Sequence, residues 1–161
     1  MSFSHAIDNR YFEDYVEGDV HTFGSIDVTE DEIIAFARRY DPQSLHTVPE
    51  AAKLTPFGGL IASGWHTAGL MMRLYVEHYL THVASLTSPG LDELRWLKPV
   101  RPGDRLSVRV TVLKATPSRS KPDRGAVTSL VEVFNQTNEA VMSLKVVNII
   151  GRRPATSVAA S

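Results

Sequence analysis

Apolar residues recur along this chain at two spacings, and the change from one to the other separates a helical part from a strand part. Between residues 29 and 83 they return every three or four positions, as on one face of an α-helix. From residue 91 to residue 150 they alternate with polar residues, as in half-buried β-strands. A strand-like run also covers residues 20–28. The pattern predicts one strand, then helices, then four strands.

The first predicted helix has signals at both of its ends. Thr29 stands three residues before Glu32, which is the spacing of a capping box. The buried face follows at helical spacing, with Ile33, Phe36, Ala37 and Tyr40. Pro42 ends the helix, because a proline disfavours the α conformation of the residue before it. Asp41 is that residue, so we expect it to lie in an irregular turn.

A longer helix is predicted from Gly64 to about Val83, after a short helix near Pro49 and a glycine- and proline-rich loop over residues 55–64. Its apolar positions cover more than one face, so other parts of the protein must cover most of it. The connections between the later strands are mostly too short for parallel crossovers. We therefore predict an α+β domain in which a long central helix packs on a curved antiparallel sheet.

Composition sets limits on the function. The chain has 161 residues, of which 43% are apolar, and its 17 basic and 18 acidic side chains give a formal charge of −1. This length suits one domain, expected over residues 1–151, followed by a loose tail over residues 152–161. The balanced charge gives no global attraction to nucleic acid or to an anionic membrane. Without cysteine there is no disulfide, thiolate nucleophile or cysteine-bound metal.

The N-terminal sequence lacks the basic and apolar regions of a signal peptide. The longest apolar helix contains Arg73, Glu77 and His78, which a membrane span would exclude. We therefore expect a cytoplasmic protein with neither a membrane nor a nucleic-acid partner.

Asp41 and His46 are the first candidates for chemistry. The turn that Pro42 forces allows their side chains to converge, and a carboxylate beside an imidazole supplies a base and a proton donor near neutral pH. A helix-ending aspartate and a packed histidine would give the same spacing. The spacing alone leaves both interpretations open.

Gly64 is the second candidate, because it begins the long helix directly after the glycine-rich loop. Its backbone N–H is one of the unpaired donors at a helix start, and such a donor suits a carbonyl oxygen that gains negative charge. An ordinary helix start at Ser63-Gly64 would look the same.

The remaining titratable residues give weaker signals. His78 and His82 have the spacing of a metal pair, but no third ligand stands at a matching offset, so we predict a solvated helix edge and no metal. The loop of residues 116–125 carries Arg119, Lys121 and Arg124, which could hold a phosphorylated ligand. The chain contains no nucleotide-binding glycine motif and no Gly-x-Ser-x-Gly nucleophile motif.

Taken together, the segment FARRYDPQSLHTVPEAAKLTPFGGLIASGWHTAGL resembles the active-site region of the MaoC-like dehydratases, the family of the (R)-specific enoyl-CoA hydratases. That family has an Asp-x-Asn-Pro-x-His motif, and here Asp41 and His46 keep its spacing. Gln43 and Ser44 replace Asn-Pro, and Gln43 can still supply an amide that orients Asp41. The later segment LDELRWLKPVRPGDRLSVRVTVL also resembles the family, so the likeness runs from about Tyr11 to Ile150.

The resemblance implies a hotdog fold, in which a curled antiparallel sheet wraps a long helix, and a homodimer with an acyl tunnel near the interface. It implies that Asp41 and His46 add water to a 2-enoyl thioester, with the Gly64 N–H on the thioester oxygen and without a cofactor. We expect an acyl-CoA or acyl-carrier-protein thioester as the partner. The expected substrate contacts are Gln43, Ser63, Trp65, His66, Arg119, Lys121 and Arg124.

Two alternatives remain open from the sequence. A hotdog thioesterase would hydrolyse the thioester with one carboxylate near the helix start and would not need the Asp41/His46 pair. A non-catalytic subunit would bind acyl-CoA without turning it over.

Overall fold

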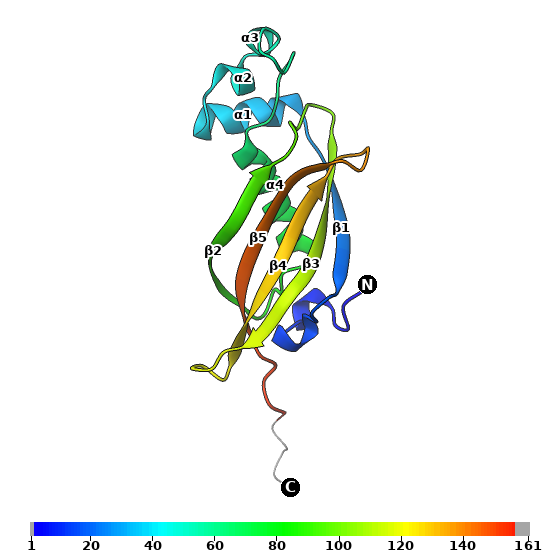
Figure 1. Ribbon diagram of the computed structural model, residues 1–161, viewed down its shortest axis with the longest axis vertical. Coiled ribbons are helices and arrows are strands. Elements are labelled where there is room, and N and C mark those ends of the chain that lie inside the picture. Colours follow the sequence, from blue (N-terminus) through cyan, green and yellow to red (C-terminus); the bar gives the residue numbers. More distant parts are fainter. Residues whose placement is uncertain (1, 157–161) are drawn as a thin grey trace.

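The computed structural model describes residues 2–156, and its centre is a long helix, α4 (Gly64–His78), against one face of a five-stranded sheet (Figure 1). The strands are β1 (Val20–Asp27), β2 (Ser85–Trp96), β3 (Arg105–Pro117), β4 (Arg124–Phe134) and β5 (Ala140–Gly151). They lie in the order β1-β3-β4-β5-β2, and all neighbours are antiparallel. The predicted α+β architecture with an antiparallel sheet is confirmed.

Three helices gather beyond one end of the sheet, near the start of α4 (Figure 1). They are α1 (Glu30–Tyr40), α2 (Ser44–Thr47) and α3 (Pro49–Ala52). Thr29 caps α1 as predicted, because its hydroxyl accepts the N–H of Glu32 at 3.2 Å. The helix also ends where Pro42 requires, and Asp41 leaves the helical conformation with φ −152° and ψ 69°. Two short 3-10 turns, η1 (Ile7–Asn9) and η2 (Phe12–Asp14), precede β1 and were not predicted.

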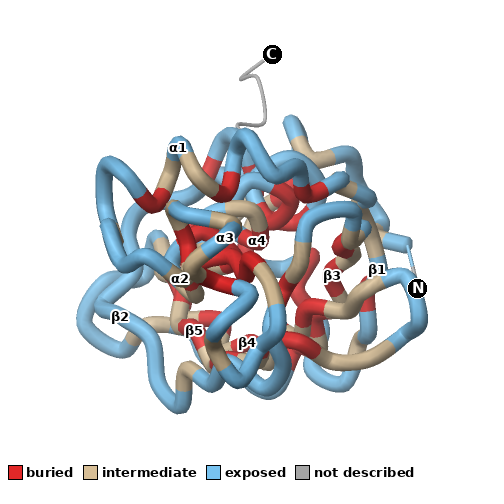
Figure 2. The backbone as a smooth tube through the Cα atoms, turned by 90° about the horizontal axis from the view of Figure 1, so that it is seen from above, coloured by how far each residue is buried: buried red, intermediate tan, exposed pale blue. Residues whose placement is uncertain are grey.

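The core lies between α4 and the sheet, where Figure 2 shows the buried residues in the middle of the molecule. Alternate residues of the strands point into it, as their sequence pattern predicts; those of β3 are Leu106, Val108, Val110 and Val112. Full burial of such side chains stabilises the fold by roughly 1.5–3 kcal/mol each. The two large tyrosines of this core keep hydrogen bonds, Tyr75 to Asn148 and Tyr79 to Ser129.

Helix α4 ends at His78, so its predicted end near Val83 is wrong. Arg10 donates hydrogen bonds to the carbonyl oxygens of His78 and Tyr79, at 3.2 and 2.8 Å. Tyr15 donates a further one to the Tyr79 carbonyl at 2.9 Å. A continuing helix would need these two carbonyls for its own next N–H groups. Side chains from the N-terminal segment therefore end the helix.

Strand β2 also differs from the sequence prediction, in which the alternation begins at residue 91, because it begins at Ser85 and ends at Trp96. Among the described residues 2–156 it pairs with β5 alone and forms one edge of the sheet. An edge strand tolerates Pro89, which has no N–H to donate, and three register irregularities interrupt the pairing. Figure 2 shows β2 exposed along its length.

The residues after β5 contact the N-terminal turns. Arg152 and Arg153, at the start of the expected tail, form ion pairs with Glu13 and Asp14, each at 3.0 Å. Residues 157–161 of that tail lie outside the described residues. Within residues 2–156, no helix is both long enough and apolar enough to cross a membrane.

Arg10→Met should lower the free energy of unfolding by about 1–3 kcal/mol, because the His78 carbonyl loses its side-chain donor and the Tyr79 carbonyl keeps only Tyr15. Urea unfolding measures this change. Arg73→Met is the control, since it removes an exposed Arg73–Glu77 pair worth less than about 1 kcal/mol. Equal losses in the two variants would contradict the role of Arg10 at the helix end.

Candidate active site

Asp41 accepts two hydrogen bonds from neutral side chains. The amide of Gln43 donates to Oδ1 at 2.8 Å, and the hydroxyl of Ser63 donates to Oδ2 at 2.7 Å. The Gln43 bond, followed by the Ser63 bond, lowers the pKa of Asp41 below its ordinary value. This carboxylate therefore stabilises the fold above its unfolded pKa of about 3.9. That contribution is lost as the pH falls through the folded pKa.

His46 lies buried in α2, and a backbone contact fixes its tautomer. Its Nδ1 lies 2.7 Å from the carbonyl oxygen of Ile61. A carbonyl only accepts, so the proton of the neutral ring is on Nδ1. The other nitrogen, Nε2, lies 3.4 Å from Oδ2 of Asp41. Nε2 therefore has a free lone pair beside a charged carboxylate.

Ser63 joins this pair of residues to the start of α4. It is completely buried, and its hydroxyl oxygen accepts the N–H of Trp65 at 3.3 Å as the N-cap of the helix. The same hydroxyl donates to Asp41, which lies 22 residues earlier in the chain. Within residues 2–156, the N–H of Gly64 has no protein acceptor. The structure thus places the unpaired N–H of Gly64 directly after Ser63, whose hydroxyl group binds Asp41.

Position 64 is a glycine because an aromatic ring leaves no room there for a side chain. A Cβ on Gly64 would lie 2.2 Å from a ring atom of Trp96. The indole Nε1 of Trp96 also donates to the Gly64 carbonyl at 2.9 Å. The sequence gave no sign of this packing from 32 residues away.

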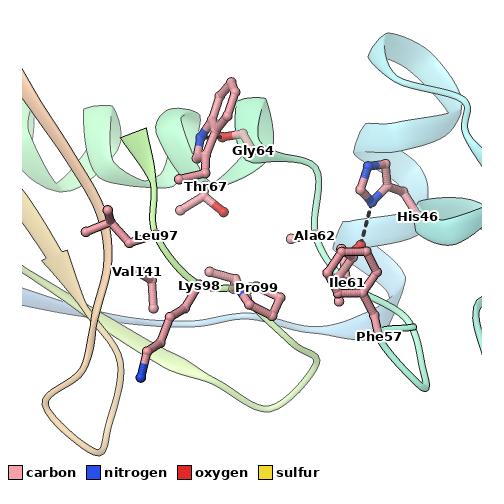
Figure 3. Close-up of a pocket in the computed structure, with 12 residues that line it drawn as sticks. His46, Phe57, Ile61, Ala62, Gly64, Thr67, Leu97, Lys98, Pro99 and Val141 are labelled. Carbon is pink, nitrogen blue, oxygen red and sulfur yellow. Dashed lines mark hydrogen bonds between the residues drawn. The ribbon is translucent and has the colours of Figure 1, made fainter. Parts of the chain in front are cut away.

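A pocket of about 310 Å³ lies beside these groups (Figure 3). Figure 3 shows Gly64 and Thr67 on α4, with His46 and Phe57 across the pocket from them. Its other lining residues are mostly apolar: Ile61, Ala62, Trp96, Leu97, Lys98, Pro99, Val100 and Val141. Thr67 was not predicted, although its position one turn after Gly64 on the same helix face could have suggested it. The arrangement suits a small, largely apolar molecule with one polar end.

Two further predicted contacts, His66 and Trp65, lie next to the pocket without lining it. His66 is buried in the first turn of α4 and stacks on Phe36 of α1, with ring centroids 4.9 Å apart. Burial lowers its pKa, which the charge of Glu32 opposes. Trp65 is 57% exposed and meets Trp96 edge-on at 5.2 Å.

The predicted basic residues lie elsewhere in this chain. Arg119 and Lys121 are in the β3–β4 hairpin, at the end of the sheet remote from α1, α2 and α3, and Arg124 begins β4 (Figure 1). Arg124 pairs with Asp123 at 2.8 Å, whereas Arg119 and Lys121 form no ion pair within residues 2–156. In the same described range, no group of three or more side chains is arranged to hold a metal ion.

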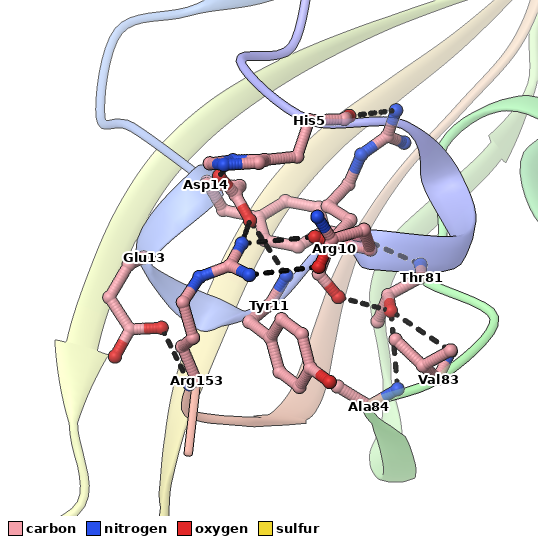
Figure 4. Close-up of polar contacts among 11 residues, drawn as sticks. His5, Arg10, Tyr11, Glu13, Asp14, Thr81, Val83, Ala84 and Arg153 are labelled. Carbon is pink, nitrogen blue, oxygen red and sulfur yellow. Dashed lines mark hydrogen bonds and ion pairs between the residues drawn. The ribbon is translucent and has the colours of Figure 1, made fainter. Parts of the chain in front are cut away.

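A second polar cluster lies at the other end of α4 (Figure 4). Asp14 is buried there between His5 and Arg153, and the N–H of Tyr11 also donates to it. Burial disfavours its charge, but these donors prevail, so the pKa of Asp14 is lowered. The cluster joins the two ends of the described chain and has a structural role.

Comparison with known proteins identifies relatives of this chain. The family model described as MaoC like domain matches residues 12–134. A MaoC-like dehydratase from Rhodospirillum rubrum superposes with a TM-score of 0.84 at 42% identity, over 91% of this chain and 99% of that one. The 3-hydroxyacyl-thioester dehydratase Z of Mycobacterium tuberculosis is 28% identical over 127 residues, which cover 78% of this chain and 84% of that protein.

A double hotdog protein of Mycobacterium tuberculosis has a TM-score of 0.78 at 16% identity, over 93% of this chain and 46% of its own length. The sheet wrapped on α4 is thus a hotdog fold, as the sequence resemblance implied. The chain belongs to the MaoC-like domain family.

Ser63→Ala removes both hydrogen bonds of Ser63. We expect the pKa of Asp41 to rise toward its ordinary value, because one donor to its carboxylate is lost. We also expect the free energy of unfolding at pH 7 to fall by about 1 kcal/mol or more, since α4 loses its N-cap. NMR titration of the Asp41 carboxyl carbon and urea unfolding measure the two effects.

Gln43→Leu is the matched control, because it removes the other donor to Asp41 and keeps the cap of α4. The pKa of Asp41 should rise in both variants, whereas the larger loss of stability belongs to Ser63→Ala. If the pKa of Asp41 stays the same in both, these hydrogen bonds do not set it.

Proposed function

We propose that this protein adds water reversibly to the double bond of a 2-enoyl thioester, most directly one linked to CoA. The observation that carries the proposal is the 3.4 Å approach of His46 Nε2 to Asp41 Oδ2, beside a pocket that also contains Gly64. This combination offers a base, a charged partner for that base, and an N–H for a developing oxyanion.

In the hydration direction, His46 Nε2 accepts a proton from a water molecule whose oxygen bonds to C3 of the substrate. Asp41 orients this water and stabilises the imidazolium that forms. The electron pair of the C2–C3 double bond moves to the thioester oxygen, where the Gly64 N–H stabilises the enolate. The imidazolium then returns its proton to C2, so the enzyme ends unchanged. Dehydration is the same path in reverse.

The electrostatics of the site suit this path. A lowered pKa keeps Asp41 charged at neutral pH, so it can stabilise positive charge on His46. The Ile61 carbonyl holds the His46 proton on Nδ1, which leaves Nε2 free to act. Gln43 and Ser63 orient Asp41 and need not touch the substrate.

The substrate class follows from the pocket and from the relatives. Apolar side chains line most of the pocket, which fits the carbon chain beyond the thioester. The relative from Mycobacterium tuberculosis is named for 3-hydroxyacyl thioesters, and we extend that class to this chain. Trp65 and His66 would then influence substrate binding indirectly. Trp65 packs against Trp96, and His66 packs against Phe36.

We also infer that the working form is a homodimer. Eight large apolar side chains stay at least 38% exposed on α4, on β2 and on the residues flanking β2. They are Trp65, Met72, Val76, Val83, Leu86, Leu91, Trp96 and Leu97. A monomer rarely leaves so much apolar surface together, so a second copy is the expected cover.

The test is hydration of crotonyl-CoA, followed by the loss of enoyl-thioester absorbance. The native chain should turn the substrate over, and Asp41→Asn and His46→Ala should each lower kcat/KM by roughly 10²–10⁴-fold. Asp31→Asn, an exposed aspartate in the first turn of α1, is the matched control and should keep full activity.

Two outcomes would favour one of the alternative functions. Release of free CoA from saturated acyl-CoA, unaffected by His46→Ala, would favour the thioesterase. Tight binding of enoyl-CoA without turnover, also with longer and branched chains, would favour the non-catalytic subunit.

A further inference from the structure

Thr67 carries a buried hydroxyl group that forms no hydrogen bond with any residue in the range 2–156. The residue is 2% exposed and lies in α4, one turn after Gly64. Its backbone N–H donates to the Ser63 carbonyl at 3.1 Å, but its side chain has no partner in this part of the chain. Buried hydroxyl groups nearly always have a partner, so this exception needs an explanation.

A threonine inside a helix usually satisfies its own hydroxyl group. It donates the proton to a carbonyl oxygen three or four residues earlier in the same helix. Thr47 does so at the end of α2, where its hydroxyl donates to the Gln43 carbonyl at 3.1 Å. For Thr67 the two carbonyls within reach are those of Ser63 and Gly64, and it bonds to neither through its side chain.

Both of these carbonyls already have two donors. The Ser63 oxygen accepts the backbone N–H groups of His66 at 3.0 Å and of Thr67 at 3.1 Å. The Gly64 oxygen lies inside the helix and accepts its ordinary helical N–H, and it also accepts the indole N–H of Trp96 at 2.9 Å. A carbonyl oxygen has two lone pairs, so neither oxygen has one left for the Thr67 hydroxyl.

The Thr67 hydroxyl therefore remains available to the pocket that its side chain lines. Figure 3 shows Thr67 beside Gly64 on α4, with His46 on the opposite side of the pocket. A side chain in a helix covers the turn before its own Cα, so that of Thr67 lies over the turn of Gly64. Positions one turn apart on a helix face are about 5–6 Å apart. Two hydrogen bonds of about 3 Å can thus meet at one oxygen atom between them.

The other polar side chains of the pocket already have partners or another role. The ammonium group of Lys98 pairs with Glu139, and Figure 3 shows it directed away from Gly64. The ring of His46 keeps its proton at the Ile61 carbonyl and presents a lone pair at Nε2. Among the described side chains that line the pocket, the unpaired donor is the Thr67 hydroxyl.

We propose that Thr67 is a catalytic residue: its hydroxyl group donates a second hydrogen bond, beside that of the Gly64 N–H, to the thioester oxygen of the substrate as this oxygen becomes an enolate. Trp96 is a positioning residue, because its indole N–H occupies the Gly64 carbonyl and so keeps the Thr67 hydroxyl turned to the pocket. A second donor aimed at developing negative charge lowers the barrier further. This inference rests on the proposed function and names a further residue of that same site.

The first experiment replaces the hydroxyl group and keeps the branched shape of the side chain. Thr67→Val should lower kcat for crotonyl-CoA by roughly 10²–10³-fold and change KM little, because the lost bond is strongest in the transition state. Thr67→Ser keeps the donor and should keep most of the activity. Thr111→Val, the same change on the outer face of β3, is the matched control and should keep the native kcat.

Stability separates this role from a structural one. The native hydroxyl has no bond within the described chain, so Thr67→Val should unfold at the same or a higher urea concentration than the native protein. A clearly lower unfolding midpoint would mean that the hydroxyl has a partner in the folded chain, which contradicts the proposal. An unchanged kcat also contradicts it. So does a higher KM at the native kcat, since the hydroxyl would then bind another part of the substrate.

The second experiment tests the role of Trp96 with a double-mutant cycle. Trp96→Phe removes the indole N–H, so the Thr67 hydroxyl can bond back to the Gly64 carbonyl. We expect kcat to fall roughly threefold to tenfold in the native background, and to fall much less when Thr67→Val is already present. An equal fall in both backgrounds would show that Trp96 does not act through Thr67.

Acetoacetyl-CoA distinguishes this inference from the proposed function, because it forms an ultraviolet-absorbing enolate without any hydration step. The ratio of enolate to keto form, measured on the bound molecule, should be roughly tenfold or more lower with Thr67→Val than with the native protein. If this difference is found but crotonyl-CoA is not hydrated, the donor pair stands and the proposed function fails. If crotonyl-CoA is hydrated and the two enolate ratios are equal, only the role of Thr67 is overturned.

Discussion

The hydroxyl group of Ser63 connects the central helix to the residues that can perform chemistry. It accepts the N–H of Trp65 at the start of α4, and it donates to Asp41 from the turn that follows α1. Helix α4 is itself fixed by packing of Tyr75 and Tyr79 in the core. Because one oxygen atom takes part in both contacts, the position of Asp41 is tied to the hydrophobic core. A second hydrogen bond, between His46 Nδ1 and the carbonyl oxygen of Ile61, also holds the turn after Pro42.

The site keeps a charged carboxylate without a permanent cation. Neutral donors, Gln43 and Ser63, lower the pKa of Asp41, and His46 lies close enough to gain from that charge when it is protonated. An arginine in the place of these donors would have neutralised Asp41 and removed its effect on the imidazole. A backbone carbonyl, that of Ile61, decides which nitrogen of His46 is free. In the proposed mechanism, these polar groups without net charge prepare the pair for proton transfer.

Other parts of the chain cover both ends of α4, whereas the two edges of the sheet differ in how apolar they are. The N-terminal segment closes the far end of α4 through hydrogen bonds of Arg10 and Tyr15 with Tyr79 and Thr81, and α1, α2 and α3 close the end with the pocket. Along the sides, β1 presents mostly polar residues, whereas β2 and the adjoining face of α4 remain apolar and open. An unpaired apolar edge is a hazard for a monomer. The second copy of the chain that we propose as a partner would cover this edge.

The sequence by itself determined the elements whose signals are local. The cap at Thr29, the stop at Pro42 and the alternation of β3, β4 and β5 predicted those elements to within a few residues, because capping and one-sided burial act between near neighbours. The turn at Pro42 and the helix start at Gly64 also made Asp41, His46 and Gly64 candidates, and the family resemblance, rather than the spacing, gave them catalytic roles. Only the tertiary structure decided where α4 ends, where β2 begins and why residue 64 is glycine. Each of these depends on a contact between distant residues: Arg10 with the carbonyls of α4, β2 with β5, and Trp96 with Gly64. Such contacts produce no periodic pattern in the sequence, because they form only when the chain has folded.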